Sequence, residues 1–200
     1  MRLIIPTVAL CVALVTAASM EVPSKEGLSL RTAENANIEG LPIVDLEVTD
    51  DRIEGRVFSG TYESAVAEMK AFRPEFFARE VEEDESKDDT GLDKREGAPV
   101  KCNWGGRIGS WNQCIDGMVS LGRAGDKWCV VKPSSCARVS CSYNCGMFLC
   151  NKRKKAQKVR CRNIPDHINA IGEKCRNVFG QINGRRDFRN YFIGLGKQKC

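Results

Sequence analysis

Ten of the 11 cysteines lie in the second half of this 200-residue chain, and their clustering constrains the fold more than any other feature. The cysteine content of this half is about twice the content that already indicates a disulfide scaffold. Zinc ribbons also cluster cysteines, but no Cys-x-x-Cys occurs, and the spacing of Cys141 and Cys145 falls in a stretch that we interpret as strand and turn. We therefore predict five disulfides, no metal site and no cofactor, with a pairing that spacing alone cannot give. The cysteines are Cys102, Cys114, Cys129, Cys136, Cys141, Cys145, Cys150, Cys161, Cys175 and Cys200.

The first 19 residues have the pattern of a secretory signal peptide. Arg2 precedes an apolar run that ends at Val15, and small residues follow up to Ser19. The run is too short to span a bilayer comfortably. Cleavage after it would remove Cys11 and leave an even number of cysteines in an oxidising compartment, where disulfides persist. We predict a secreted, extracellular protein.

The net charge of the chain changes sign near residue 95, where the cysteine-rich half also begins. Residues 1–95 carry 11 basic and 20 acidic side chains, whereas residues 96–200 carry 20 and 6, a net charge of +14. Lys94 and Arg95 stand at this boundary, after an acidic block that we expect to be solvated and flexible. The alternative to a processing site is an ordinary surface Lys-Arg pair. We predict an acidic, partly disordered propeptide over residues 20–95, which a dibasic-specific protease removes and which shields the mature domain during export.

Two stretches of the predicted propeptide have the pattern of ordered structure. Residues 41–48 alternate enough for a strand. Thr61 can cap a helix whose apolar residues recur at helical spacing up to Phe72, before Pro74.

The cysteine-rich half has the pattern of alternating helices and strands. Apolar spacing predicts helices over 111–122 and 164–175, the second with Pro165 in its first turn. Strands are predicted over 127–131 and 188–193, and two helices on one face of a small antiparallel sheet is the simplest assembly. We therefore expect an α+β fold, a small disulfide-rich α/β sandwich.

A hairpin is predicted in the middle of this half. Residues 138–143 alternate, so we expect the odd-numbered residues on one face and the even-numbered ones on the other. A turn over 144–146 then leads into a strand over 147–150. Glycines at both ends of 194–196 indicate a further turn.

Four stretches of residues 101–200 carry a family resemblance. They are a Gly-Ser…Gln-Cys turn at 109–114, a helix followed by Trp128-Cys129, an Ala-Arg-Val-Ser-Cys strand at 137–141, and an Asn-Tyr strand before the terminal cysteine. In this order they resemble the killer protein 4 family, the virally encoded killer toxins of smut fungi and their cellular fungal relatives. Several cysteines differ in number and spacing from that family, so the resemblance supplies no disulfide pairing.

The resemblance implies an α/β sandwich and a toxin that acts from outside its target cell. It implies that the toxin blocks calcium uptake and performs no catalysis. The critical lysine of the family lies in the strand that resembles 137–141, and Arg138 occupies the matching position. Arginine keeps the charge there but not the compact ammonium group.

The strongest local signal is a run of seven basic residues with no acidic residue among them. The run consists of Lys152, Arg153, Lys154, Lys155, Lys158, Arg160 and Arg162. The alternative to a functional role is a solvated loop. Such a run is attracted to an acidic cell wall, a membrane surface or the mouth of a channel. It lacks the interleaved aromatic residues that stack on bases, so we expect no nucleic-acid partner.

Candidates for catalysis are few. His167 is the only histidine, and Glu173 lies six residues away, on a different face of the predicted helix. A small ribonuclease needs a histidine with a second histidine or a glutamate, and an arginine at the phosphate. Sequence motifs of hydrolases and phosphate-binding loops are absent. We predict no catalytic residue and no enzyme, with a small secreted ribonuclease using His167 as the alternative.

The sequence thus predicts a monomeric, secreted toxin or fungal effector that acts by binding. Arg138 and the basic run are its predicted contacts with a protein, a channel or an acidic surface of the target cell. A non-catalytic cell-wall-binding protein is the further alternative.

Overall fold

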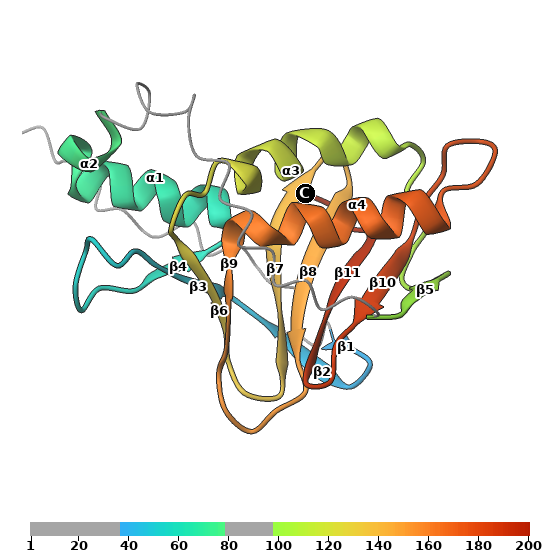
Figure 1. Ribbon diagram of the computed structural model, residues 1–200, viewed down its shortest axis with the longest axis horizontal. Coiled ribbons are helices and arrows are strands. Elements are labelled where there is room, and N and C mark those ends of the chain that lie inside the picture. Colours follow the sequence, from blue (N-terminus) through green and yellow to red (C-terminus); the bar gives the residue numbers. More distant parts are fainter. Residues whose placement is uncertain (1–36, 79–97) are drawn as a thin grey trace, which may run out of the picture. The chain divides into compact units, whose positions relative to one another are not determined.

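A computed structural model describes residues 37–78 and 98–200, and these residues form an α+β fold with mostly antiparallel strand pairs (Figure 1). Both stretches belong to one unit. The predicted signal peptide, the acidic block and the Lys94-Arg95 pair lie outside the described residues. Within the described part of the chain, no helix is long and apolar enough to cross a membrane.

The strands of the described residues form two sheets. The larger sheet has the order β1-β2-β7-β8-β11-β10-β5, and the smaller one the order β4-β3-β6-β9. The pairing of β2 with β7 is parallel. The strands are β1 (Asn37–Ile38), β2 (Leu41–Val44), β3 (Leu46–Thr49), β4 (Phe58–Gly60), β5 (Val100–Cys102), β6 (Trp128–Val131), β7 (Ser135–Ser142), β8 (Cys145–Asn151), β9 (Gln157–Arg160), β10 (Gly184–Asp187) and β11 (Tyr191–Lys197).

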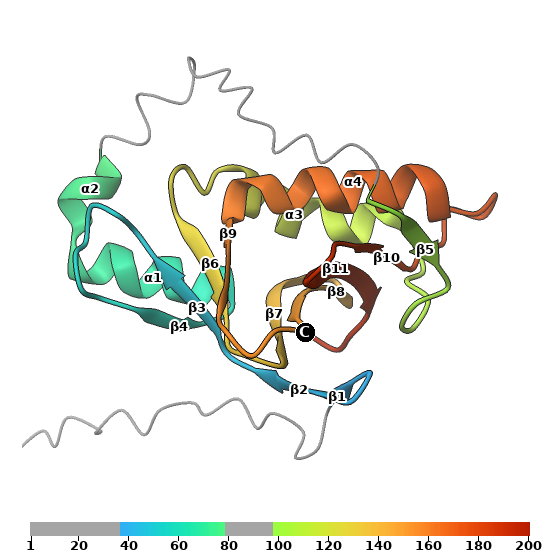
Figure 2. The same cartoon turned by 60° about the horizontal axis from the view of Figure 1, so that its bottom comes forward.

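Two helices of the cysteine-rich half cover one face of the larger sheet, as the sequence predicts (Figures 1 and 2). Helix α3 (Ile115–Gly122) packs on β7, and α4 (Ile164–Cys175) packs on β5, β10 and β11. Each follows a short 3₁₀ turn, Trp111–Cys114 before α3 and Cys161–Asn163 before α4. The isoleucine stripe of α4 is buried because its members recur at helical spacing on the side that faces the sheet.

The first described stretch contains the strand and the helix that the sequence predicts there. Strands β2 and β3 cover the predicted strand region, and α1 (Tyr62–Phe72) begins after Thr61, whose hydroxyl accepts a hydrogen bond from the backbone N–H of Ser64 at 3.3 Å. Helix α2 (Pro74–Ala78) follows directly. Leu46, Phe58 and Met69 are fully buried in the same core as the isoleucines of α4. Residues 37–78 therefore supply part of the hydrophobic core.

The five predicted disulfides are present. The pairs are Cys102–Cys175, Cys114–Cys145, Cys129–Cys161, Cys136–Cys150 and Cys141–Cys200. All five therefore lie within residues 102–200, and none ties residues 37–78 to the remainder of the chain.

The predicted alternation along residues 138–143 is wrong. A bulge between Arg138 and Ser140 places two consecutive residues, Val139 and Ser140, on the buried side. An extra residue in one strand shifts every later side chain to the other face. The hairpin turn also comes one residue earlier than predicted, at Tyr143 and Asn144, which both have positive φ angles.

The end of the chain also differs from its prediction. Residues 188–190 are not strand but the turn between β10 and β11. The predicted turn at 194–196 is instead the middle of β11, where Gly194 lies under the ring of Trp104 and has no space for a Cβ atom. The glycines of this stretch therefore allow close packing and not a change of direction.

Candidate functional site: the surface under residues 37–51

Residues 37–51, which we call the N-terminal strap, cross the free edges of two strands of the cysteine-rich domain (residues 98–200). Strand β2 pairs with β7, and β3 then pairs with β6, so that Glu47 lies opposite Val130 and Thr49 opposite Trp128. Figure 2 shows β2 and β3 running on from one another along these edges. The strap therefore joins the two sheets on a surface that belongs to the cysteine-rich domain.

Charge is opposite on the two sides of this contact. Residues 37–78 hold 4 basic and 9 acidic side chains, and residues 98–200 hold 20 and 5. Four ion pairs join the strap to the domain, and in all four the carboxylate belongs to the strap. They are Glu39–Arg185, Glu47–Lys132 at 3.5 Å, Asp50–Lys127 at 3.8 Å and Asp51–Arg160 at 3.4 Å.

Asp51 occupies a carboxylate site built around an indole ring. The Nε1–H of Trp128 donates a hydrogen bond to the Asp51 carboxylate at 3.0 Å. The cations of Arg160 and Lys158 lie 3.6 and 4.2 Å from the centre of the same ring. The Trp128 hydrogen bond has the largest effect, and together with the charges of Lys158 and Arg160 it outweighs desolvation and holds the pKa of Asp51 below its ordinary value. The site thus favours a negatively charged ligand.

Asp50, the neighbouring residue, is buried with a buried lysine. The side chains of Asp50 and Lys127 are both only 1% exposed. Burial raises the pKa of Asp50, but hydrogen bonds from the side chain and backbone of Arg52 and the nearby Lys127 outweigh it and hold this pKa below its ordinary value. Because Lys127 belongs to the domain, the strap provides a counter-charge for a cation that is out of contact with water.

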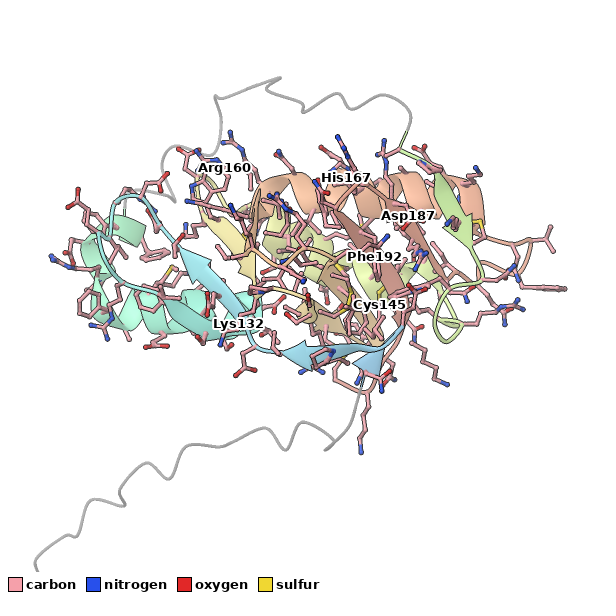
Figure 3. The ribbon with its side chains drawn as sticks, turned by 90° about the horizontal axis from the view of Figure 1, so that it is seen from below. Lys132, Cys145, Arg160, His167, Asp187 and Phe192 are labelled. Carbon is pink, nitrogen blue, oxygen red and sulfur yellow. A yellow bond between two sulfur atoms is a disulfide. The ribbon has the colours of Figure 1, made fainter. Side chains whose placement is uncertain are left out.

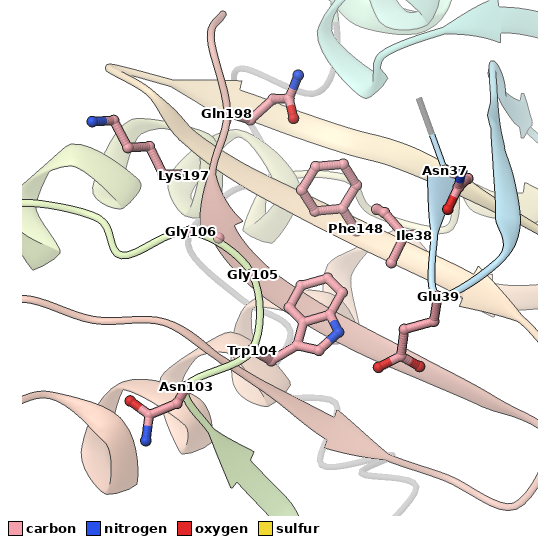
Figure 4. Close-up of a pocket in the computed structure, with 11 residues that line it drawn as sticks. Asn37, Ile38, Glu39, Asn103, Trp104, Gly105, Gly106, Phe148, Lys197 and Gln198 are labelled. Atoms are coloured by element: carbon pink, nitrogen blue, oxygen red, sulfur yellow. The ribbon is translucent and has the colours of Figure 1, made fainter. Parts of the chain in front are cut away.

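The start of the strap covers an aromatic patch on the face of the larger sheet opposite the helices. Phe148 and Phe192 pack there with Trp104, and Ile38 and Leu41 of the strap pack against them. Figure 4 shows Ile38 beside Phe148 and Trp104, in a pocket of about 360 Å³. Apolar as well as ionic contacts therefore hold the strap.

A wide open groove runs where α1 and α2 approach α3 and β6. Its volume is about 1210 Å³, and residues of both described stretches line it. Tyr62, Val66 and Phe77 contribute from the first stretch, and Val119 and Lys127 from the second. Solvent thus reaches between the two parts on this side.

The structure does not gather the predicted basic run into one patch. Lys152 lies 3.3 Å from Asp187, and Arg153 to Lys155 lie exposed in the β8–β9 loop. Lys158 and Arg160 flank Trp128, and Arg162 pairs with Asp126. Figure 3 shows Arg160 of this run in a different region from Asp187, the partner of Lys152. Trp128 is not among the contact residues predicted from the sequence, although it faces the basic residues of β9 across a strand pair.

Arg138 lies apart from this run. Its guanidinium donates a hydrogen bond to the backbone carbonyl of Lys199 at 3.3 Å, on the face that also carries the Cys141–Cys200 disulfide. The bulge beside it separates it from Ser140, whose hydroxyl donates to Glu63 on the opposite face.

His167 lies in the first turn of α4, with an arginine beside it. Its Nδ1 is 3.2 Å from a guanidinium nitrogen of Arg186, and its ring meets that of Phe188 edge-on at 5.0 Å. Burial raises the pKa of the adjacent Asp166, although the charge of Arg186 opposes this rise. The guanidinium can donate a hydrogen bond to Nδ1 only when this nitrogen carries no proton.

A metal site is not found among the residues that the structure describes. They contain no group of three or more histidine, cysteine, aspartate or glutamate side chains placed to hold an ion. The ten cysteines, whose clustering alone is also compatible with zinc ligands, are joined in disulfides.

Comparisons of the chain with protein-family models, curated proteins and solved structures find no match. The fold and the surface under the strap still describe the architecture of the protein. This is a disulfide-rich α+β domain that carries an acidic, noncovalently held N-terminal segment on its basic surface.

Proposed function

We propose that the chain is the precursor of a secreted, non-catalytic toxin or effector. In this proposal the basic cysteine-rich domain binds a surface component of a target cell after cleavage at Lys94-Arg95 has freed the acidic segment. The observation that carries the proposal is the one-sided contact, in which four strap carboxylates face four domain cations and no disulfide joins the two parts.

The noncovalent character of this contact is what makes release after cleavage physically reasonable. A disulfide across it would hold the segment in place after proteolysis. Ion pairs and strand pairing become intermolecular after the cut, so dilution favours their dissociation. The five disulfides remain in the domain and stabilise it in the absence of the segment, each by about 2–4 kcal/mol.

The proposed mode of action is the one that the killer protein 4 resemblance implies. The domain acts from outside the cell, and block of calcium uptake is the specific form of that action. Arg138 is proposed as a contact, since its side chain is only partly buried. Of the basic run, Arg153 to Lys155 are exposed candidates in the β8–β9 loop.

A secretion experiment tests the proposal. We expect the secreted wild-type chain to begin at residue 96 by mass spectrometry and to inhibit the growth of sensitive fungal cells, with relief by excess calcium. The double variant Lys94→Ala/Arg95→Ala should be secreted at full length and should inhibit at least about tenfold less, because the strap stays attached. An uncut wild-type product that is fully active would refute the proposal.

The ribonuclease alternative rests on one observation, the arginine beside His167. His167→Ala separates the two, because a binding protein keeps its growth inhibition when this imidazole is lost. Loss of inhibition together with loss of RNA cleavage would establish the enzyme instead. Arg176→Ala, an exposed arginine after the same helix, is the control for a general effect on folding.

A further inference from the structure

Building on the proposed function, we infer that the β6 edge under the strap is the docking site for an extended acidic segment of a target protein. That segment adds to β6 as a strand and places a carboxylate against Trp128 and Arg160. The strap occupies this site in the precursor and has the chemistry of the ligand.

Strand β6 has a free edge once the strap has left. It lies between β3 and β9 in the smaller sheet, and β3 is part of the strap. Removal of β3 leaves the backbone N–H and C=O groups of β6 that face β3 without their strand partners, while those that face β9 stay paired. Such an edge binds an added strand through main-chain hydrogen bonds.

The carboxylate site lies at the end of this edge and is built from domain residues. Trp128 begins β6, and Arg160 pairs opposite it on β9, with Lys158 two residues away on the same strand. The Trp128 N–H donates to the Asp51 carboxylate, Arg160 lies 3.4 Å from it, and Lys158 lies over the same indole ring. A ligand with a carboxylate two residues beyond its paired strand reproduces this contact, as Asp51 follows Thr49.

The strap also defines which side chains the site accepts. Leu46 and Val48 are fully buried, while Glu47 between them points to Lys132. The side chains of residues 46–51 are, in order, apolar, acidic, apolar, neutral polar, acidic and acidic. Alternate residues of a strand face opposite sides, so Leu46 and Val48 enter the core while Glu47 meets the basic rim; Asp50, just after the strand, is buried beside Lys127.

This register favours a polypeptide over an anionic membrane. Lipid headgroups supply negative charge, but they supply neither a backbone that pairs with β6 nor apolar side chains at alternate positions. The ligand that matches both features is an extended protein segment of alternating apolar and acidic residues.

The test uses the full chain, cut once in the segment 79–97. Three fluorescent peptides are added at equal concentration: residues 41–52 of the chain, an unrelated sequence with the same apolar–acidic pattern, and a scrambled sequence of the same composition. We expect the first two to displace the N-terminal segment and bind, and the scrambled peptide to bind at least about tenfold more weakly. Binding is followed by fluorescence anisotropy, and displacement by size-exclusion chromatography.

Two variants locate the binding. Trp128→Phe keeps an aromatic ring but removes the N–H donor, and Arg160→Ala removes the cation, so each should weaken the binding of both patterned peptides by about tenfold. Arg176→Ala has the same change in charge at the end of α4 and should leave both affinities unchanged. Circular dichroism of each cut variant shows whether the fold is retained.

Four outcomes would overturn the inference. If the scrambled peptide binds equally well, the domain attracts peptides by charge alone. If only the peptide of residues 41–52 binds, the contact serves the folding of this chain and not the binding of a target. If phosphatidylserine vesicles bind and the patterned peptides do not, the ligand of the site is an anionic membrane surface and not a protein segment. A cut chain that never releases its segment would mean a site that never opens. Patterned-peptide binding by a chain that cells secrete uncut would instead refute only the proposed function.

Discussion

Asp50 and Asp51 are neighbours in the strap, but burial gives them different roles. The Asp50 carboxylate lies in the core beside Lys127, with both side chains only 1% exposed. Asp51 is exposed and contacts Trp128 and Arg160 at the surface. A buried charge that loses its partner keeps its full desolvation cost, whereas an exposed one is solvated by water.

We therefore predict that Asp50→Ala lowers the free energy of unfolding of the full chain by about 3 kcal/mol, since it leaves Lys127 buried without this counter-charge. Urea unfolding followed by circular dichroism measures the change. Asp51→Ala, one residue further along the same backbone, is the matched control and should have a much smaller effect. Equal effects of the two variants would contradict the assigned difference in burial.

The secondary-structure elements of the first described stretch depend on local signals as well as on the domain. Helix α1 begins at a threonine whose side chain takes the place of a missing helical acceptor. The buried residues Tyr62, Ala65 and Met69 recur at spacings of three and four and face the core. Helix α1 is therefore specified twice, by its cap and by its buried face.

Thr61→Ala should destabilise the full chain by about 1 kcal/mol, because the first-turn N–H group of Ser64 loses its acceptor. Thr61→Ser keeps an oxygen at the same position and should remain within a few tenths of the wild-type value. Thermal unfolding of the two variants at neutral pH makes the comparison. A loss with serine as large as that with alanine would exclude the cap as the cause.

At the scale of the whole molecule, the two described stretches share one core but no covalent bond other than the chain itself. Leu46 and Val48 of the strap are buried with the domain, and strap carboxylates meet domain cations around them. Burial supplies most of the strength of such a contact, and the charges mainly orient it. Proteolysis between residues 79 and 97 is therefore expected to leave a complex that can dissociate.

The pH dependence of the contact between the strap and the domain is expected to follow from the carboxyl groups of Asp50 and Asp51. The pKa values of Asp50 and Asp51 are held below their ordinary value of 3.8, so the ionised forms favour the bound strap. This stabilisation is complete well above pH 3.8 and is lost as the pH falls through the lowered values. We predict that, at a fixed concentration, the fraction of cut chains that keep their segment is the same at pH 7 and pH 5 and falls only when the pH drops below the ordinary value of 3.8.

Size-exclusion chromatography of the cut chain over this pH range measures the release. Asp50→Asn should remove much of the acid dependence, since an amide does not titrate in this range. Release that is already complete at pH 5 would show that another group controls the contact.

Local patterns were sufficient for a large part of this protein. The cysteine cluster indicated a disulfide scaffold, and helical spacing located α1, α3 and α4, because both signals lie within short stretches of chain. The bulge at Val139 and the turn at 188–190 were missed, since register depends on the partner strand and not on local alternation.

The pairing of the cysteines and the surface under the strap required the fold. Trp128, Arg160 and Asp51 are brought together by strand pairs that join residues about 30 and about 80 positions apart. Charge composition showed that the two halves attract, but composition holds no information on which carboxylate meets which cation. Long-range backbone pairing and the burial of Leu46 and Val48 specify that, because they place the strap in a single register.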